Sequence, residues 1–148
     1  MNKNYKISIA SDHAGFELKE FLKSELASKN YEVFDLGTDS KNSVDYPDFA
    51  EKLALHIKDK KSDFGILICG SGIGISIAAN RYNHIRAALC NNLEVTKLAR
   101  QHNNANVICL GARFIDNKIA LEMVEAFFNT EFEGGRHTER VRKLCNAK

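Results

Sequence analysis

Several features that mark other protein classes are missing or scarce in this chain of 148 residues. It has no tryptophan, one proline and a formal net charge of only +2. Its basic residues are spread along the sequence and form no stripe, so nucleic-acid binding has little support. The four cysteines form no C-x-x-C pair and no metal-ligand spacing with histidine, and no apolar run approaches membrane-spanning length. We therefore expect no nucleic acid, no membrane and no metal among its partners.

The composition that is present is that of an ordinary globular protein. Hydrophobic residues make up 44% of the chain and charged residues 27%, which are usual proportions. The length suffices for one self-sufficient core, so we expect residues 1–148 to form a single domain. A first strand already begins at Tyr5, which leaves no room for a signal peptide. Free thiols fit a reducing compartment, and we expect a cytoplasmic protein.

The most informative stretch is Phe64 to Asn80, which reads FGILICGSGIGISIAAN. Residues 66–68 predict a buried strand, the glycines after it a tight turn, and the residues from Ile73 onward a packed helix. Unpaired backbone N–H groups in such a turn favour an anion. It is neither of two familiar phosphate loops, because Ile75 or Ile77 replaces the third glycine of the dinucleotide fingerprint and the lysine of the ATP-type loop is missing.

Cys69 is the last residue of that strand and stands directly before the glycine turn. A thiol beside a helix N-terminus favours the thiolate, so we expect a lowered pKa and a reactive sulfur. The alternative is a buried structural cysteine, which is the commoner role for an isolated cysteine.

Strands and helices alternate along the whole chain. The apolar spacing predicts strands at 5–11, 31–36, 66–68, 85–90 and 105–110, and helices at 16–28, 47–60, from 73, 93–102, 119–128 and 135–144. This order predicts an α/β fold, a three-layer Rossmann-like sandwich whose five-stranded parallel sheet has helices on both faces, plus a C-terminal helix. Ligands of such sheets bind beyond the carboxyl ends of the strands, where Asp12, His13, the glycine turn and Arg113 fall.

Six short segments stand out beyond this pattern: SDHAGF (11–16), DYP (45–47), ICGSGIGISIAAN (68–80), RQHN (100–103), GAR (111–113) and EGGRHxxR (133–140). In this order and spacing they resemble the ribose-5-phosphate isomerase B family, which includes allose-6-phosphate isomerases and galactose-6-phosphate isomerase subunits. The resemblance extends over about residues 5–144. It implies reversible conversion of ribose 5-phosphate to ribulose 5-phosphate without a metal or cofactor.

The resemblance also implies roles for individual residues. Cys69 is then the base that moves a proton between C1 and C2, and His102 helps to open the furanose ring. One branch of the family uses a glutamate inside the loop instead, but here Ile75 stands at that position, so Cys69 is the expected base. The remaining family positions hold the substrate: Asp12, His13, Gly70, Ser71, Gly72, Ile73, Gly74, Asn103, Arg113, Arg136 and Arg140.

The chemistry suits these residue types. Aldose–ketose isomerisation removes a proton next to a carbonyl, so it needs an ionised base and preorganised donors for the enediolate oxygen. The thiolate of Cys69 and the amides of residues 70–74 can supply both. Ser71 either anchors an oxygen or caps the following helix.

Other side chains have a functional and a structural interpretation. Arg136 and Arg140 are four residues apart on a helix, where they can grip one phosphate together or form a solvated face paired with Glu133 and Glu139. His13 beside Asp12 can likewise be a loop hydrogen-bond pair. We expect His56 and His84 to be structural, and we place His137 outside the site. Tyr46 is a weaker candidate for covering the sugar.

His102 raises a geometric difficulty. The helix that ends there starts at the carboxyl edge of the sheet and runs back, so at 1.5 Å per residue His102 lies roughly 14 Å away from that edge. Within one subunit it cannot reach Cys69. We therefore expect a homodimer with two shared active sites, or a dimer of such dimers.

Three alternatives remain open at this point. The substrate is a six-carbon sugar phosphate such as allose 6-phosphate if the pocket is longer. A non-catalytic sugar-phosphate-binding module would keep the arginines and the glycine turn but has no need of Cys69 and His102. A redox-sensing thiol protein would use Cys69, yet no second cysteine lies within twenty residues of it.

Overall fold

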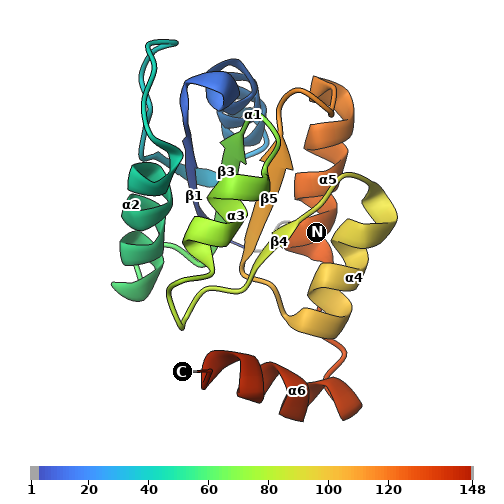
Figure 1. The fold of residues 1–148 in the computed structure, drawn as a ribbon. Coiled ribbons are helices and arrows are strands. Elements are labelled where there is room, and N and C mark those ends of the chain that lie inside the picture. Colours follow the sequence, from blue (N-terminus) through green and yellow to red (C-terminus); the bar gives the residue numbers. More distant parts are fainter. Residues whose placement is uncertain (1–3, 148) are drawn as a thin grey trace.

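A computed structural model describes residues 4–147 of the chain, and its centre is a five-stranded sheet (Figure 1). The strands are β1 (Lys6–Ser11), β2 (Glu32–Asp35), β3 (Phe64–Cys69), β4 (Ala87–Leu89) and β5 (Val107–Gly111). They lie in the order β2-β1-β3-β5-β4, and all four pairings are parallel. The predicted parallel α/β sandwich is confirmed.

Six α-helices and one 3-10 turn connect and follow the strands. They are η1 (His13–Gly15), α1 (Phe16–Ser28), α2 (Tyr46–Lys58), α3 (Ile73–Ala79), α4 (Leu93–Asn103), α5 (Asn117–Asn129) and α6 (Arg136–Cys145). Each of the six α-helices corresponds to a stretch predicted from the apolar spacing, and Pro47 lies in the first turn of α2 as expected. Strand β4 is shorter than predicted, because the side chain of Asn106 takes the backbone N–H of Arg86 before the ladder begins.

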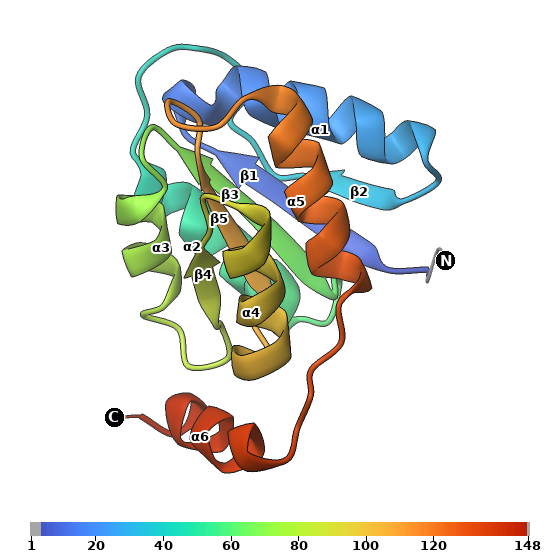
Figure 2. The ribbon, with the colours of Figure 1, turned by 90° about the vertical axis from the view of Figure 1, so that its right-hand side faces the viewer.

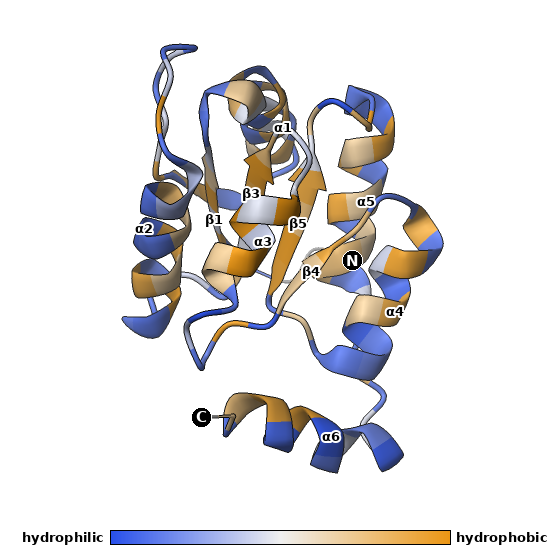
Figure 3. Cartoon of the chain, viewed as in Figure 1, coloured by the Kyte–Doolittle hydropathy of each residue, from blue (hydrophilic) through white to orange (hydrophobic). Residues whose placement is uncertain are grey.

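The helices cover both faces of the sheet and bury two separate apolar clusters. On one face α1, α4 and α5 pack on residues such as Ile9, Ile66 and Ile108. On the other face α2 and α3 pack on residues such as Leu67 and Cys109. Figure 3 shows hydrophobic strands at the centre and hydrophilic residues on helices such as α2 and α4, whereas α3 is largely apolar. Alternate residues of each central strand therefore serve opposite layers, which explains their continuous apolar sequence.

The chain reverses its direction of travel across the sheet at β1. From β1 it moves to β2 on one side, and it then returns to β3 on the other side of β1. A crevice opens at such a switch point, beyond the carboxyl ends of the two strands concerned. Here these ends are Ser11 and Cys69, so the sheet order alone brings the segments after β1 and β3 together.

Helix α6 lies apart from the three layers, beyond the amino ends of the strands (Figures 1 and 2). Gly134 and Gly135 both have positive φ, +69° and +55°, and they turn the chain into this helix. The backbone N–H of Glu133 donates to the carbonyl of Gln101 at 3.0 Å, and Arg86 Nη1 donates to Cys145 Sγ at 3.3 Å. The last helix is thus attached to the end of α4 and to the segment before β4.

Within residues 4–147, the helices are all too short or too polar to traverse a lipid bilayer.

Three polar side chains are linked by hydrogen bonds near the amino ends of β1 and β3, on the side of the sheet that α2 covers. Nδ1 of His56 lies 2.9 Å from Ser62 Oγ, which donates to Ser8 Oγ at 3.0 Å, and Ser8 Oγ donates to the carbonyl of Phe64. Burial, and then the charge of Lys61, hold the pKa of His56 below its usual range. His56 is structural in this position, as predicted.

The lowered pKa of His56 makes stability depend on pH. Because the unfolded chain takes up the proton more readily, this contribution is complete above the unfolded pKa of about 6.5 and is lost as the pH falls below it. We expect the wild type to lose more stability than His56→Asn between pH 7.5 and pH 5.5 in urea denaturation. Equal losses in the two proteins would contradict this assignment.

Candidate functional site

Cys69 lies at the carboxyl edge of the sheet, in contact with the glycine turn. It is the last residue of β3 and is 4% exposed. Its Sγ accepts the backbone N–H of Gly72 at 3.1 Å. This bond holds the thiol at the junction of β3 and the glycine turn.

The turn after Cys69 depends on glycine at two places where backbones meet. Gly72 has φ of +79° and an added Cβ there would lie 2.9 Å from the carbonyl carbon of Leu110. Gly111, on the neighbouring strand β5, would place a Cβ 2.5 Å from the carbonyl oxygen of Ser71. The turn therefore rests directly on the end of β5. The N-cap of α3 is Gly72 and not Ser71, although the Ser71 hydroxyl still accepts the N–H of Ile73 at 3.1 Å.

Asp12 and His13 face this turn from the end of β1. The backbone N–H of Asp12 donates to the carbonyl of Ile68, and its buried carboxylate accepts the N–H of Gly15 at 3.1 Å. His13 Nδ1 accepts the N–H of Val44 at 3.2 Å, which assigns the proton of the neutral ring to Nε2. Asp12 and His13 also line an open depression formed with the loop 43–48.

Two further side chains lie over the glycine turn. Arg113 is tied to it by its backbone N–H, which donates to the carbonyl of Gly70 at 3.1 Å, and a Cβ on Gly70 would come within 3.0 Å of its guanidinium. The ring of Tyr46, from the start of α2, lies against Gly74 so closely that a Cβ there would be 2.5 Å from its Cζ. The side chains of Arg113 and Tyr46 therefore lie directly against the glycine turn.

The other buried cysteines differ from Cys69 in their surroundings. Burial raises the pKa of Cys90 to about 11. Burial also raises the pKa of Cys109, which is fully enclosed between the layers, well above its usual range. Both therefore remain neutral thiols at physiological pH. Cys69 differs from them in accepting a backbone N–H group.

A second group of polar side chains lies at the opposite edge of the sheet. The rings of His102 and His137 stack with centroids 4.3 Å apart and planes 15° apart. Glu133 Oε1 is 3.9 Å from Nε2 of each. His137 is only 6% exposed, and its burial, followed by the nearby His102 and Arg136, lowers its pKa.

The structure shows which residues of α6 face inward. His137, which the sequence analysis placed outside the site, is buried together with Val141, whereas Arg136 and Arg140 are exposed. Glu139 pairs with Arg142, and Glu133 lies against the two histidines. The described ion pairs therefore do not include the pairing with Arg136 and Arg140 that the structural alternative supposed. The i, i+4 spacing of His137 and Val141 was the available signal.

The two groups are separated by the length of the central strand. Arg100, in the last turns of α4, places its guanidinium 5.0 Å from the ring of Phe64, the first residue of β3. Cys69 is at the other end of that strand, about 16 Å farther on at 3.3 Å per residue. As Figure 2 shows, α4 ends and α6 begins beyond the amino ends of the strands. His102, Asn103, Arg136 and Arg140 therefore form one half of the predicted site, and Asp12, His13, Cys69, Arg113 and residues 70–74 form the other.

The histidine group is also the candidate metal site of residues 4–147. His102, Glu133 and His137 offer three ligand atoms within 4.8 Å of one another. Two imidazoles and a carboxylate are a donor set for zinc, but a zinc ion would need each atom about 2 Å from it. The stacked rings of His102 and His137 would have to separate to bind the ion. The positively charged arginines of α6 would also repel it. The group fits a proton or an anion better than a metal ion.

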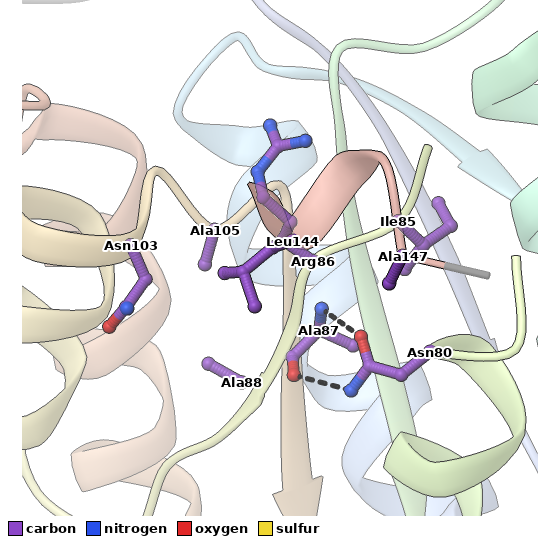
Figure 4. A pocket seen from close by; sticks show the side chains of 9 residues that line it. All are labelled: Asn80, Ile85, Arg86, Ala87, Ala88, Asn103, Ala105, Leu144 and Ala147. Carbon is purple, nitrogen blue, oxygen red and sulfur yellow. Dashed lines mark hydrogen bonds between the residues drawn. The ribbon is translucent and has the colours of Figure 1, made fainter. Parts of the chain in front are cut away.

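A cavity of about 430 Å³ lies between β4 and α6, and Figure 4 shows its lining. Asn80 closes one side through two hydrogen bonds to the backbone of Ala87, at 2.8 and 2.9 Å. Asn103 is the one predicted site residue in the lining, and the half-exposed side chain of Leu144 closes the other side. The cavity belongs to the amino edge and not to Cys69.

The contact of Gly111 with Ser71 makes a prediction about stability. In Gly111→Ala the added methyl meets a backbone carbonyl that cannot move without displacing the turn, so we expect a loss of roughly 1–3 kcal/mol in the free energy of unfolding. Gly65→Ala is the matched control on β3, because there the methyl meets only the flexible end of Leu53. Urea denaturation measures both, and an equal or smaller loss for Gly111→Ala would contradict the close packing.

Comparison with known proteins agrees with this geometry. The sequence model described as Ribose/Galactose Isomerase matches residues 7–144. Ribose-5-phosphate isomerase B of Escherichia coli is 42% identical over 139 residues, which cover 94% of this chain and 93% of that protein.

Two solved structures have the same fold. A ribose 5-phosphate isomerase of Thermotoga maritima is 52% identical with a TM-score of 0.96, and covers 98% of this chain and 100% of its own. Ribose-5-phosphate isomerase B of Mycoplasma genitalium, solved with bound ribulose-5-phosphate, is 41% identical with a TM-score of 0.91, over 98% and 97% of the two chains. The chain therefore belongs to the ribose/galactose isomerase family.

Proposed function

We propose that this protein interconverts ribose 5-phosphate and ribulose 5-phosphate by proton transfer through an enediolate. The observation that carries the proposal is the position of Cys69, whose sulfur accepts an N–H group at the point where β3 meets the glycine turn. Family membership and the ribulose-5-phosphate bound to the Mycoplasma genitalium relative support the substrate. The chain's own residues supply a base, donors and cations for this reaction.

Cys69 is the proposed base. As a thiolate it takes the proton from C1 or C2 and returns it to the other carbon. The N–H of Gly72 donates to the sulfur at 3.1 Å and holds it at the start of the glycine turn. Because Cys90 and Cys109 stay neutral through burial, the other enclosed thiols do not compete for this role.

The glycine turn is the proposed oxyanion site. Negative charge develops on the enediolate oxygens during proton transfer, and backbone N–H groups of residues 70–74 need no reorganisation to meet it. Ser71 offers a hydroxyl at the same turn, and Ile73 begins the short helix α3 behind it. Asp12, fixed by its bonds to Gly15 and Ile68, and His13 then hold sugar hydroxyls at the rim.

Arginines from both edges are the proposed phosphate site. Arg136 and Arg140 are exposed on the same face of α6, and Arg113 lies over Gly70. Guanidinium groups bind phosphate oxygens through paired N–H donors. Asn103, beside His102 at the end of α4, adds an amide to that half of the site.

A complete site then requires two copies of the chain. A two-fold axis perpendicular to the strands brings the carboxyl edge of one copy against the amino edge of the other, and does so twice. Apolar side chains next to the glycine turn offer a surface for this contact: Ile73 and Ile77 are 53% and 52% exposed on α3, and Leu89 is 39% exposed on β4. We propose a homodimer in which His102 of one copy assists ring opening in the site of Cys69 of the other.

The reaction is tested by a coupled assay on ribose 5-phosphate, with allose 6-phosphate beside it. We expect turnover of the five-carbon sugar, and a loss of roughly 100- to 10,000-fold in kcat for Cys69→Ala because the base is removed. Cys90→Ala is the matched control. A fully active Cys69→Ala protein would refute the role of the thiol, and preference for allose 6-phosphate would move the substrate to the six-carbon class.

The shared site is tested by mixing inactive variants. Cys69→Ala and His102→Ala are unfolded, combined in equal amounts and refolded. About half of the dimers are then mixed and each contains one complete site, so we expect about a quarter of the wild-type activity. Each variant refolded alone is the control. If mixed dimers are isolated and remain inactive, the site is not shared.

A further inference from the structure

The contacts of His102 are too few to fix its ring. It lies in the last turn of α4, and its side chain is 37% exposed. Its nearest opposite charge, Glu133, is 3.9 Å away, which is beyond hydrogen-bond distance. The contact that defines the plane of the ring is the stack on His137, at 4.3 Å and 15°.

His137, in contrast, is held from several sides. It is 6% exposed, and its backbone N–H donates to the carbonyl of Gly134 at 3.0 Å. Arg136 Nε donates to its Nε2 at 3.4 Å, so Nε2 is an acceptor and the neutral ring carries its proton on Nδ1. The charged groups that face it are His102, Arg136, Arg140 and Glu133. Burial, and then His102 and the two arginines, lower its pKa and favour the neutral ring, whereas Glu133 acts in the opposite direction.

The segment before α6 is in turn fixed to α4. Glu133 donates its backbone N–H to the carbonyl of Gln101, the residue before His102. Gly134 and Gly135 follow with positive φ and set the direction in which α6 leaves. His137 is thereby held against the end of α4, and its flat face is the surface on which His102 rests.

We propose that His137 is a positioning residue for ring opening, which holds the imidazole of His102 in the orientation needed to act on the ring oxygen of a furanose sugar phosphate. The inference rests on the proposed function and adds to it a residue that neither touches substrate nor transfers a proton. In ring opening a proton moves from the C1 hydroxyl to the ring oxygen O4 while the C1–O4 bond breaks and C1 becomes an aldehyde. A group that moves this proton must lie within about 3 Å of its partner, and a misplacement of about 1 Å costs up to roughly 100-fold in rate.

Measurements on the two sugars of the reaction can distinguish a role in ring opening from a general structural role of His137. Ribose 5-phosphate is mainly a furanose and must be opened. In ribulose 5-phosphate a furanose ring would need the C5 oxygen, which carries the phosphate. This sugar therefore remains open-chain. Exchange of its C1 hydrogen with deuterium in D₂O therefore needs the Cys69 step but no ring opening. A residue that serves only ring opening affects turnover of the first sugar and leaves exchange of the second.

The experiment compares His137→Ala, His137→Phe and the neighbouring Thr138→Ala in the full-length protein. We expect His137→Ala to lower kcat for ribose 5-phosphate by roughly 10- to 100-fold, with C1 exchange of ribulose 5-phosphate as in the wild type. His137→Phe keeps a flat ring without a nitrogen and should restore most of kcat. Thr138→Ala, an exposed residue of the same helix, should match the wild type in both measurements.

A double variant adds a second criterion. If His137 acts through His102, then His102→Ala combined with His137→Ala should turn over no more slowly than His102→Ala alone. A loss equal to the product of the two single losses overturns the proposal. So does an equal fall of turnover and exchange in His137→Ala, or a His137→Phe protein no better than His137→Ala.

A variant that does not fold and a wild type without activity have different consequences. If His137→Ala does not fold, as judged by its thermal transition, His137→Asn replaces it in the comparison with His137→Phe, and equal kcat values for these two overturn the proposal. If the wild type neither turns over ribose 5-phosphate nor exchanges the C1 hydrogen of ribulose 5-phosphate, the proposed function itself is wrong and the inference falls with it.

Discussion

The hydrogen bond from the N–H of Gly72 to the sulfur of Cys69 depends on the close approach of two backbones. At 3.1 Å it is possible only because Gly72 adopts a φ of +79°. The turn that contains Gly72 rests on β5, where Gly111 leaves no space for a side chain beneath Ser71. Sheet order supplies both surfaces, since β3 lies between β1 and β5. The position of this thiol is therefore a consequence of the parallel sheet and two glycines.

The same parallel arrangement separates the predicted site into two halves. A helix that connects parallel strands must return to the amino edge, so a residue at its end is always far from the carboxyl edge. His102 and Asn103 end α4 in this way, and α6 adds its arginines at the same edge. A single copy thus contains all of the expected residue types but not in one place. The proposed two-fold symmetry would join them, and the exposed side chains of Ile73 and Ile77 are the surface proposed for that contact.

Much of the fold could be predicted from the sequence because its signals are local. Apolar spacing gave the strands and helices, and helix length alone placed His102 at the far edge from Cys69. The orientation of α6 could not be predicted, because two glycines with positive φ set its direction and its packing depends on α4. The stacking of His137 on His102 was not predicted for that reason. The contact of Tyr46 with Gly74 could not be predicted either. A long loop precedes α2, and loop conformation has no periodic signal in the sequence.

The burial of Cys69 and the exposure of His102 suit different tasks. A base that abstracts a proton from carbon gains from a dry surrounding with fixed dipoles, and Cys69 is almost enclosed by its own turn. A group that meets a cyclic sugar as it arrives must be open to the solvent until a ligand covers it. Such an exposed side chain has little packing to hold it, so its orientation must come from a neighbour. In the proposal made above this neighbour is His137, which is enclosed, stacks on His102 and has a lowered pKa.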